Sequence, residues 1–323
     1  DVSGAFRAYA QRDIDAVDQL LARHKPGGRD NPTQADLRGF EWRLLDNLCK
    51  PPEMTILDGH EPQGTNKPEP SKVALIPNSD DCLTVGYDGY LRRWSLRDHE
   101  QKSACHIGPI LDTIAVSNDG KWFVTSERIE KHGNPIAIRD VKTGAIVQRL
   151  TSHDNTLESA CFSPDRKYVA TADRYNEVML QRTDGTGVTR RKIGSRSESL
   201  AFTPDGKYMM AIVRSGQQYL EKLSLPDLKT VDKWSCSVHP IVFAISGDGR
   251  RLVAADANEI ALYSLPAMKQ LIYENRIRGR IRCVALNQDG SRIYAGCDNG
   301  SLFAWDLRGA ASTDKLPPPI VMS

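Results

Sequence analysis

Residues 200–210 read Leu-Ala-Phe-Thr-Pro-Asp-Gly-Lys-Tyr-Met-Met. An apolar run, Leu200–Phe202, is followed by a turn centred on Asp205 and then by a second apolar run, Tyr208–Met210. Asp and Pro favour the start of a chain reversal, and the glycine that follows tolerates a positive φ at its end. The stretch therefore predicts a β-hairpin.

The same pattern occurs six times along the chain. The turns are centred on aspartates that lie 39 to 46 residues apart, namely Asp80, Asp119, Asp165, Asp205, Asp248 and Asp289. This spacing is typical of a four-stranded propeller blade, which takes roughly 40 to 45 residues. The strands before the turns are almost wholly apolar, as expected of strands that neighbouring blades bury on both faces. We therefore expect an all-β, six-bladed β-propeller over residues 51–323, with seven blades as the alternative.

The ends of the repeat must also be accounted for, because an open edge strand exposes unpaired backbone groups. Met54–Leu57 precedes the first repeat, and we expect it to form the outer strand of the last blade, which closes the ring. The tail contains Pro317–Pro319 and should lie along an edge or hang free, because proline donates no backbone hydrogen bond. A seventh blade built with chain beyond residue 323 is the competing arrangement. Residues 61–71, rich in Pro and Gly, predict a surface loop.

The first fifty residues have a different pattern. Their apolar residues recur at helical spacing and predict three short amphipathic helices, with breaks at Gly27–Gly28 and Asn31–Pro32. We expect residues 1–50 to form a helical adaptor that packs on another part of the protein. The chain begins at Asp1 with no Met, which is typical of a part of a longer or processed protein.

The composition limits the partners. The 323 residues include 43 Lys+Arg and 41 Asp+Glu, and the net charge of +2 produces no long-range field that would gather nucleic acid. No apolar stretch approaches the roughly 20 residues of a membrane span. The seven cysteines occur singly, without a Cys-x-x-Cys pair, so we expect reduced thiols in the core and no structural zinc site. Cytoplasmic and extracytoplasmic locations both stay open.

Catalytic signatures are missing from the sequence. It contains no glycine-rich phosphate loop, no His-Glu-x-x-His pair and no Gly-x-Ser-x-Gly elbow. The seven histidines are scattered. We expect this segment to carry no catalytic residues, no cofactor and no metal. The alternative is a hydrolase that holds a metal ion in the central channel with carboxylates or histidines.

A row of arginines is the most distinctive candidate binding site. In an extended chain, alternate residues share one face, so four guanidinium groups would lie side by side in the row Arg276, Arg278, Arg280 and Arg282. The row enters the sixth inner strand, where it would reach the rim of the channel. Clustered arginines there could hold a carboxylate or phosphate of a peptide. A solvated edge paired with nearby acids is the plainer interpretation.

The first repeat resembles those of WD-repeat β-propellers. His60 follows a glycine, Thr84 lies on the second predicted strand, Asp88 in the next turn and Trp94 on the third strand. The resemblance implies that these four side chains form a buried, hydrogen-bonded chain. The last repeat contains the pair Trp305-Asp306, but Arg280 stands where a histidine is expected. The four middle repeats lack the tryptophan, so we expect them to depend on apolar packing.

A second resemblance lies in the predicted adaptor. The segment Asp36–Leu45, preceded by the helical stretch that ends at Pro26, resembles a junction in large bacterial eukaryotic-type serine/threonine kinases, where a WD-repeat array follows the kinase domain and a membrane segment. This resemblance implies that the chain is the non-catalytic part of such a kinase; the alternative is a WD-repeat protein without a kinase domain, in which the same junction occurs. We expect an interaction scaffold, or a sensory or docking propeller, that binds a protein or peptide on its rim.

Overall fold

The computed structural model describes residues 59–60, 70–108, 111–127, 134–175, 177–193, 199–215, 217–275, 277, 279–308, 316–317 and 319–322. The chain separates into two compact units, of which the first spans Asp1–Ile56 and the second contains the whole repeat. The predicted helices of residues 1–50 lie outside the described residues and stay a prediction. Within the described ranges, every regular element is a β-strand, and no helix is long and apolar enough to cross a membrane.

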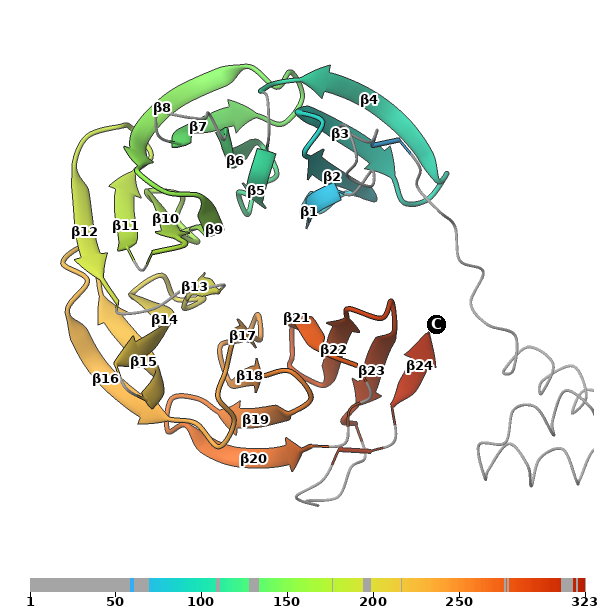
Figure 1. Ribbon diagram of the computed structural model, residues 1–323, viewed down its shortest axis with the longest axis vertical. Coiled ribbons are helices and arrows are strands. Elements are labelled where there is room, and N and C mark those ends of the chain that lie inside the picture. The colour runs from blue at the N-terminus through green and yellow to red at the C-terminus, as the bar shows by residue number, and fades with distance from the viewer. Residues whose placement is uncertain are drawn as a thin grey trace, which may run out of the picture. The chain divides into compact units, whose positions relative to one another are not determined.

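Six antiparallel sheets of four strands each form the second unit, and each sheet is one blade. Blades 1 to 3 consist of β1 (Pro70–Leu75), β2 (Asp81–Gly86), β3 (Tyr90–Ser95), β4 (Glu100–His106), β5 (Leu111–Val116), β6 (Trp122–Glu127), β7 (Asn134–Asp140), β8 (Ile146–His153), β9 (Leu157–Phe162), β10 (Tyr168–Asp173), β11 (Glu177–Arg182) and β12 (Val188–Lys192). Blades 4 to 6 consist of β13 (Leu200–Phe202), β14 (Tyr208–Ser215), β15 (Gln217–Ser224), β16 (Thr230–Ser235), β17 (Val242–Ile245), β18 (Arg251–Ala255), β19 (Ile260–Ser264), β20 (Lys269–Glu274), β21 (Ile281–Leu286), β22 (Arg292–Cys297), β23 (Leu302–Asp306) and β24 (Ile320–Met322). The first strand of each blade faces a common centre, and the fourth lies at the periphery (Figure 1). The expected all-β, six-bladed propeller is confirmed.

The predicted turns connect the first and second strands of each blade. In blade 4, Phe202 pairs with Met209, and the N–H of Lys207 donates to the Asp205 carboxylate at 3.1 Å. Gly206 has a φ of 70°, a conformation that glycine adopts without steric cost. The turn at Asp165 reaches a φ of 61° with Arg166 instead, so glycine is favoured at this position but not obligatory.

Five clusters of buried apolar side chains hold the blades together, and each cluster is shared by two consecutive blades. Between blades 4 and 5, for example, Met210 and Leu220 pack against Phe243 and Leu252. Each inner strand therefore needs apolar side chains on both of its faces, which explains why these strands read as continuous apolar runs. Among the described residues, no such cluster joins blade 6 to blade 1.

Among the described residues, apolar side chains are exposed on β23 of blade 6 and on β1 of blade 1, and these two blades stand at the two ends of the arc of blades (Figure 1). Leu302 on β23 is 37% exposed. The residues at the same register in the other blades are at most 6% exposed, and they are Leu91, Ile136, Val178, Leu220 and Ile260. On blade 1, Val73 and Leu75 are 64% and 65% exposed.

The outer strand of the last blade differs from the prediction. β24 pairs beside β23 and completes blade 6, so the C-terminal tail fills the position that we expected Met54–Leu57 to take. That assignment was wrong for blade 6, and residues 54–57 themselves lie outside the described residues. The tail does lie along an edge, as its prolines predicted, because β24 has a neighbour on one side only.

The cysteines are free thiols at all six described positions. The expectation that they lie in the core holds for Cys82, which is buried, whereas Cys105 and Cys283 are exposed. Cys105 lies on the peripheral strand β4, and Cys283 on β21 of blade 6. Both sites differ from that of Cys82, which lies on β2, a strand whose residues are all buried.

Candidate functional site

The arginine row is only partly extended. The strand β21 begins at Ile281, and Gly279 before it has a φ of 104°, so the chain turns where we expected a continuous extended run. Arg276 and Arg278 lie outside the described residues. Arg280 and Arg282 flank the buried Ile281 and are exposed, which keeps these two on one side of the chain.

Asp298 organises the two described arginines. Its carboxylate accepts the backbone N–H of Arg280 at 3.1 Å, and its own N–H donates to the Arg280 carbonyl at 2.9 Å. The Arg282 guanidinium lies 3.9 Å from the Asp298 carboxylate. An exposed ion pair of that length contributes little to stability, so the guanidinium can exchange this partner for another anion.

The four residues of the predicted hydrogen-bonded chain meet in blade 1. The His60 Nε2 lies 2.8 Å from the Thr84 hydroxyl, and the Trp94 indole N–H donates to the same hydroxyl at 2.9 Å. The His60 Nδ1 lies 3.0 Å from the Asp88 carboxylate. Arg92, which the sequence did not single out, donates to Asp88 at 2.7 Å and is buried with it. The arrangement ties β2 and β3 to the residues that precede the blade.

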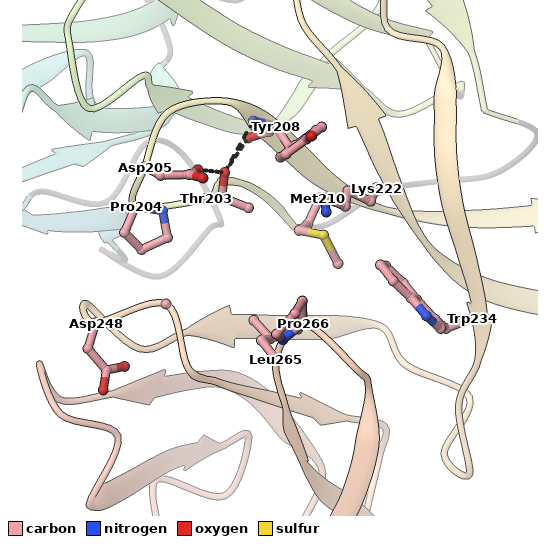
Figure 2. A pocket seen from close by; sticks show the side chains of 11 residues that line it. Thr203, Pro204, Asp205, Tyr208, Met210, Lys222, Trp234, Asp248, Leu265 and Pro266 are labelled. Atoms are coloured by element: carbon pink, nitrogen blue, oxygen red, sulfur yellow. Dashed lines mark hydrogen bonds between the residues drawn. The ribbon is translucent and has the colours of Figure 1, made fainter.

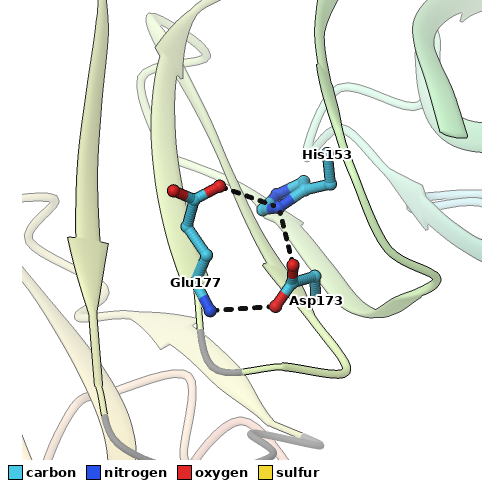
Figure 3. Close-up of side chains that lie close together, drawn as sticks. All are labelled: His153, Asp173 and Glu177. Atoms are coloured by element: carbon cyan, nitrogen blue, oxygen red, sulfur yellow. Dashed lines mark hydrogen bonds and ion pairs between the residues drawn. The ribbon is translucent and has the colours of Figure 1, made fainter. Parts of the chain in front are cut away.

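A related cluster lies where blade 2 meets blade 3. His153, the last residue of β8, lies with its Nε2 2.9 Å from the Thr171 hydroxyl on β10. Its Nδ1 points between the carboxylates of Asp173 and Glu177, as Figure 3 shows, at 3.6 Å from each. Burial lowers the pKa of His153 to about 4, so the imidazole is neutral at pH 7. One imidazole nitrogen and two carboxylates are a donor set that can hold a divalent cation.

This cluster corrects the expectation that blade 3 depends on apolar packing alone. The sequence did not single out His153, because a histidine and two acids that are 20 and 24 residues distant show no ligand spacing. The signal that could have found it is the repeat itself, since His153 has the same relation to Thr171 as His60 has to Thr84. Gln181 stands at the register of Trp94 and instead hydrogen-bonds the backbone of Thr151.

A groove opens between blades 4 and 5 (Figure 2). Its cavity of about 220 Å³ has an apolar wall formed by Tyr208, Met210, Trp234, Leu265 and Pro266. Charged side chains flank this wall. Lys222 lies over the Tyr208 ring, 4.0 Å from its centroid, and Asp205 and Asp248 come from the two neighbouring turns.

The two turn aspartates of the groove stay ionised well into acid. Donation from the Thr203 hydroxyl, the largest cause, holds the pKa of Asp205 below its usual range, and the Ser246 hydroxyl does the same for the pKa of Asp248. The groove therefore combines an apolar wall with one fixed cation and two fixed anions. Such a surface suits an apolar side chain of a peptide with charged neighbours.

The central channel has a different lining at the end where these turns meet. A cavity of about 570 Å³ there is lined by prolines, apolar side chains and the uncharged polar residues Asn78, Asn118, Ser246 and Gln288. The thiol of Cys161 also lines it, and burial raises the pKa of this thiol to about 12. Among the described lining residues of this cavity there is no carboxylate or imidazole.

The comparison with protein families agrees with the geometry. Residues 144–180 and 272–306 match the family model described as WD domain, G-beta repeat. Each match covers the outer strand of one blade and the three inner strands of the next, so the sequence repeat is offset from the blade by one strand. The two matches and the six blades support a WD-repeat propeller. Propellers of this kind generally lack catalytic activity and typically bind proteins.

Proposed function

We propose that the chain is a non-catalytic interaction scaffold that binds a peptide segment of a partner protein in the groove between blades 4 and 5. The observation that carries the proposal is Trp234, a half-buried aromatic on a peripheral strand that closes an apolar cavity beside Lys222. Aromatic side chains in such settings are the usual anchors of binding energy at protein interfaces. The rigid sheets on either side hold the groove open without a cofactor.

The arginine row supplies a second proposed contact, on the rim where inner strands begin. The groove includes a turn that follows the inner strand β13, whereas Arg280 and Arg282 stand at the start of the inner strand β21. The two contacts therefore lie at opposite ends of the blades. An acidic segment of the partner would pair with the arginines, since guanidinium groups bind carboxylates and phosphates in a bidentate geometry.

The experiment selects peptides from a random display library on the chain and measures their binding to two sets of variants. Trp234→Ala should weaken groove peptides by about fivefold or more, whereas Tyr175→Ala, an exposed aromatic outside the groove, should not. The double variant Arg280→Glu/Arg282→Glu should weaken acidic peptides in a salt-dependent way, with Arg97→Glu as the control at another exposed ion pair. Binding that survives both sets of changes would contradict the proposal.

We further propose that the chain belongs to a serine/threonine kinase of bacterial type, as its docking or sensory half. The support is the resemblance of Asp36–Leu45 to the junction of such kinases, and these residues lie outside the described ones. A propeller with separate peptide contacts would present substrates or signals to a kinase domain. The coding sequence upstream of Asp1 tests this proposal directly, because the kinase signatures are easily recognised there.

A further inference from the structure

Blades 1 and 3 use the same framework around a histidine. In blade 1, His60 contacts Thr84 and Asp88, and in blade 3, His153 lies against Thr171 and Asp173. The imidazole-to-hydroxyl distances, 2.8 and 2.9 Å, are nearly equal. The histidine and threonine of the two sites therefore correspond, but the acids come from different positions, because Asp88 lies four residues after Thr84 and Asp173 only two residues after Thr171. The two sites also differ in charge.

Blade 1 has a cation of its own at this site. Arg92, paired in register with Thr84, places its Nη1 2.7 Å from the Asp88 carboxylate and 2.9 Å from the His60 Nδ1. In blade 3 the residue paired in register with Thr171 is Met179, which is fully buried and carries no charge. The built-in cation of blade 1 has no counterpart at this position in blade 3.

Blade 3 also adds a negative charge. Glu177 brings a second carboxylate to the site. Asp173 accepts the N–H groups of Tyr175 and Glu177 and the amide of Asn155. The charged groups nearby are Asp154 and Arg190. Arg190 donates to Glu177 at 3.0 Å from the exposed side. The carboxylates of Asp173, Glu177 and Asp154 thus outnumber the partly exposed Arg190 guanidinium, an imbalance that is costly where water is excluded.

The histidine is left without a hydrogen bond on the side of the carboxylates. His153 is fully buried, and among the described residues its Nδ1 has no hydrogen-bond partner. Its distances of 3.6 Å to both carboxylates are too long for good hydrogen bonds. They are close to the separation of ligand atoms that each stand about 2.1 Å from one metal ion. All three ligand atoms lie within 4.8 Å of one another.

We propose that His153, Asp173 and Glu177 form a binding site for a divalent transition-metal ion such as Zn²⁺ or Mn²⁺. One imidazole nitrogen and two carboxylates match the preferences of these ions. The cation would stand in blade 3 for the guanidinium of Arg92 in blade 1. It would link β8 of blade 2 to the strands of blade 3, and Glu177, which is partly exposed, gives it a route to solvent. This site is separate from the groove and the arginine row, so it is tested independently of the proposed function.

The test is isothermal titration of the EDTA-dialysed chain with ZnCl₂ and, separately, with MnCl₂. One equivalent of either ion should bind and raise the melting temperature, because an ion that binds only the folded state stabilises it. Glu177→Gln should weaken binding by about tenfold or more. Glu158→Gln changes another partly buried acid outside the cluster and should leave the affinity unchanged.

Arg190→Gln is expected to change the metal affinity in the opposite direction from Glu177→Gln. It breaks the same ion pair as Glu177→Gln but keeps all three ligands, so metal affinity should be equal or higher. This result does not depend on whether Glu177→Gln folds well. The proposal is overturned if neither ion binds, if Arg190→Gln weakens binding, or if Glu177→Gln binds as tightly as the parent chain. Zinc held equally by the Glu177→Gln variant would be assigned to the exposed thiols of Cys105 and Cys283.

Discussion

At the scale of single residues, threonines at the same position in blades 1 and 3 differ in the number of buried side chains that their hydroxyl contacts. The Thr84 hydroxyl joins the His60 imidazole and the Trp94 indole, both of them buried. The Thr171 hydroxyl contacts the His153 imidazole, while the residue at the tryptophan register, Gln181, bonds elsewhere. Replacing the threonine by valine should therefore lower the free energy of unfolding by different amounts in the two blades, according to how many polar atoms it leaves without a partner.

We expect Thr84→Val to destabilise the fold by about 2 to 4 kcal/mol, because it leaves two buried polar groups unpaired. Thr171→Val should cost about 1 to 2 kcal/mol, since it affects one imidazole nitrogen. Urea denaturation followed by circular dichroism measures both values. Equal losses in the two variants would show that the indole contributes nothing to the network of blade 1.

At the scale of strands and turns, the repeat was predictable and its exceptions were not. The apolar runs and the turn aspartates predicted the hairpins of all six blades, because the signal recurs at a constant spacing. The outer strand β24 has three residues after a proline-rich stretch and shows no periodicity. The His153 cluster draws on two blades, and only the folded chain brings its residues together. The positive φ of Gly279 interrupts the extended run of arginines, and the alternation of residues in the sequence does not reveal this backbone conformation.

The ionised aspartates of the turns make the stability of the fold depend on pH in the acid range. Asp205 has a usual pKa of 3.8, and the folded turn lowers it. Its contribution to stability is therefore complete above pH 4 and is lost as the pH falls through the lowered pKa. Asp205→Asn should lower the melting temperature at pH 7 by roughly 1 to 3 °C and reduce its fall between pH 4 and pH 2. Melting curves across this range measure the effect, and parallel curves for the two proteins would contradict it.

At the scale of the whole molecule, the blades are equivalent in architecture but not in burial. Blades 2 to 5 pack against neighbours on both faces, whereas blades 1 and 6 have one described apolar cluster each. The same residue type at the same register is therefore part of the core in one blade and solvated in another. Leu220 is fully buried in blade 4, while Leu302 is exposed in blade 6.

Charge substitutions at these two leucines test the difference. Leu302→Lys should change the free energy of unfolding by no more than about 0.5 kcal/mol, as is usual for surface positions. Leu220→Lys should cost more than about 4 kcal/mol, since it buries an unpaired charge in the cluster between blades 4 and 5. Thermal melts of both variants measure this. A large loss in Leu302→Lys would mean that blade 6 is covered in solution.

The single described apolar cluster of each end blade has a consequence for how the propeller unfolds. In a linear array of repeats, stability is the sum of the units and of their nearest-neighbour interfaces, and an end unit has one interface where an inner unit has two. If the described clusters are the interfaces that count, unfolding starts at blade 1 or blade 6 and moves inward, and we expect amide protons in the middle of the array to exchange last. The groove between blades 4 and 5 is separated from either end by at least one interface, so it persists while a terminal blade frays.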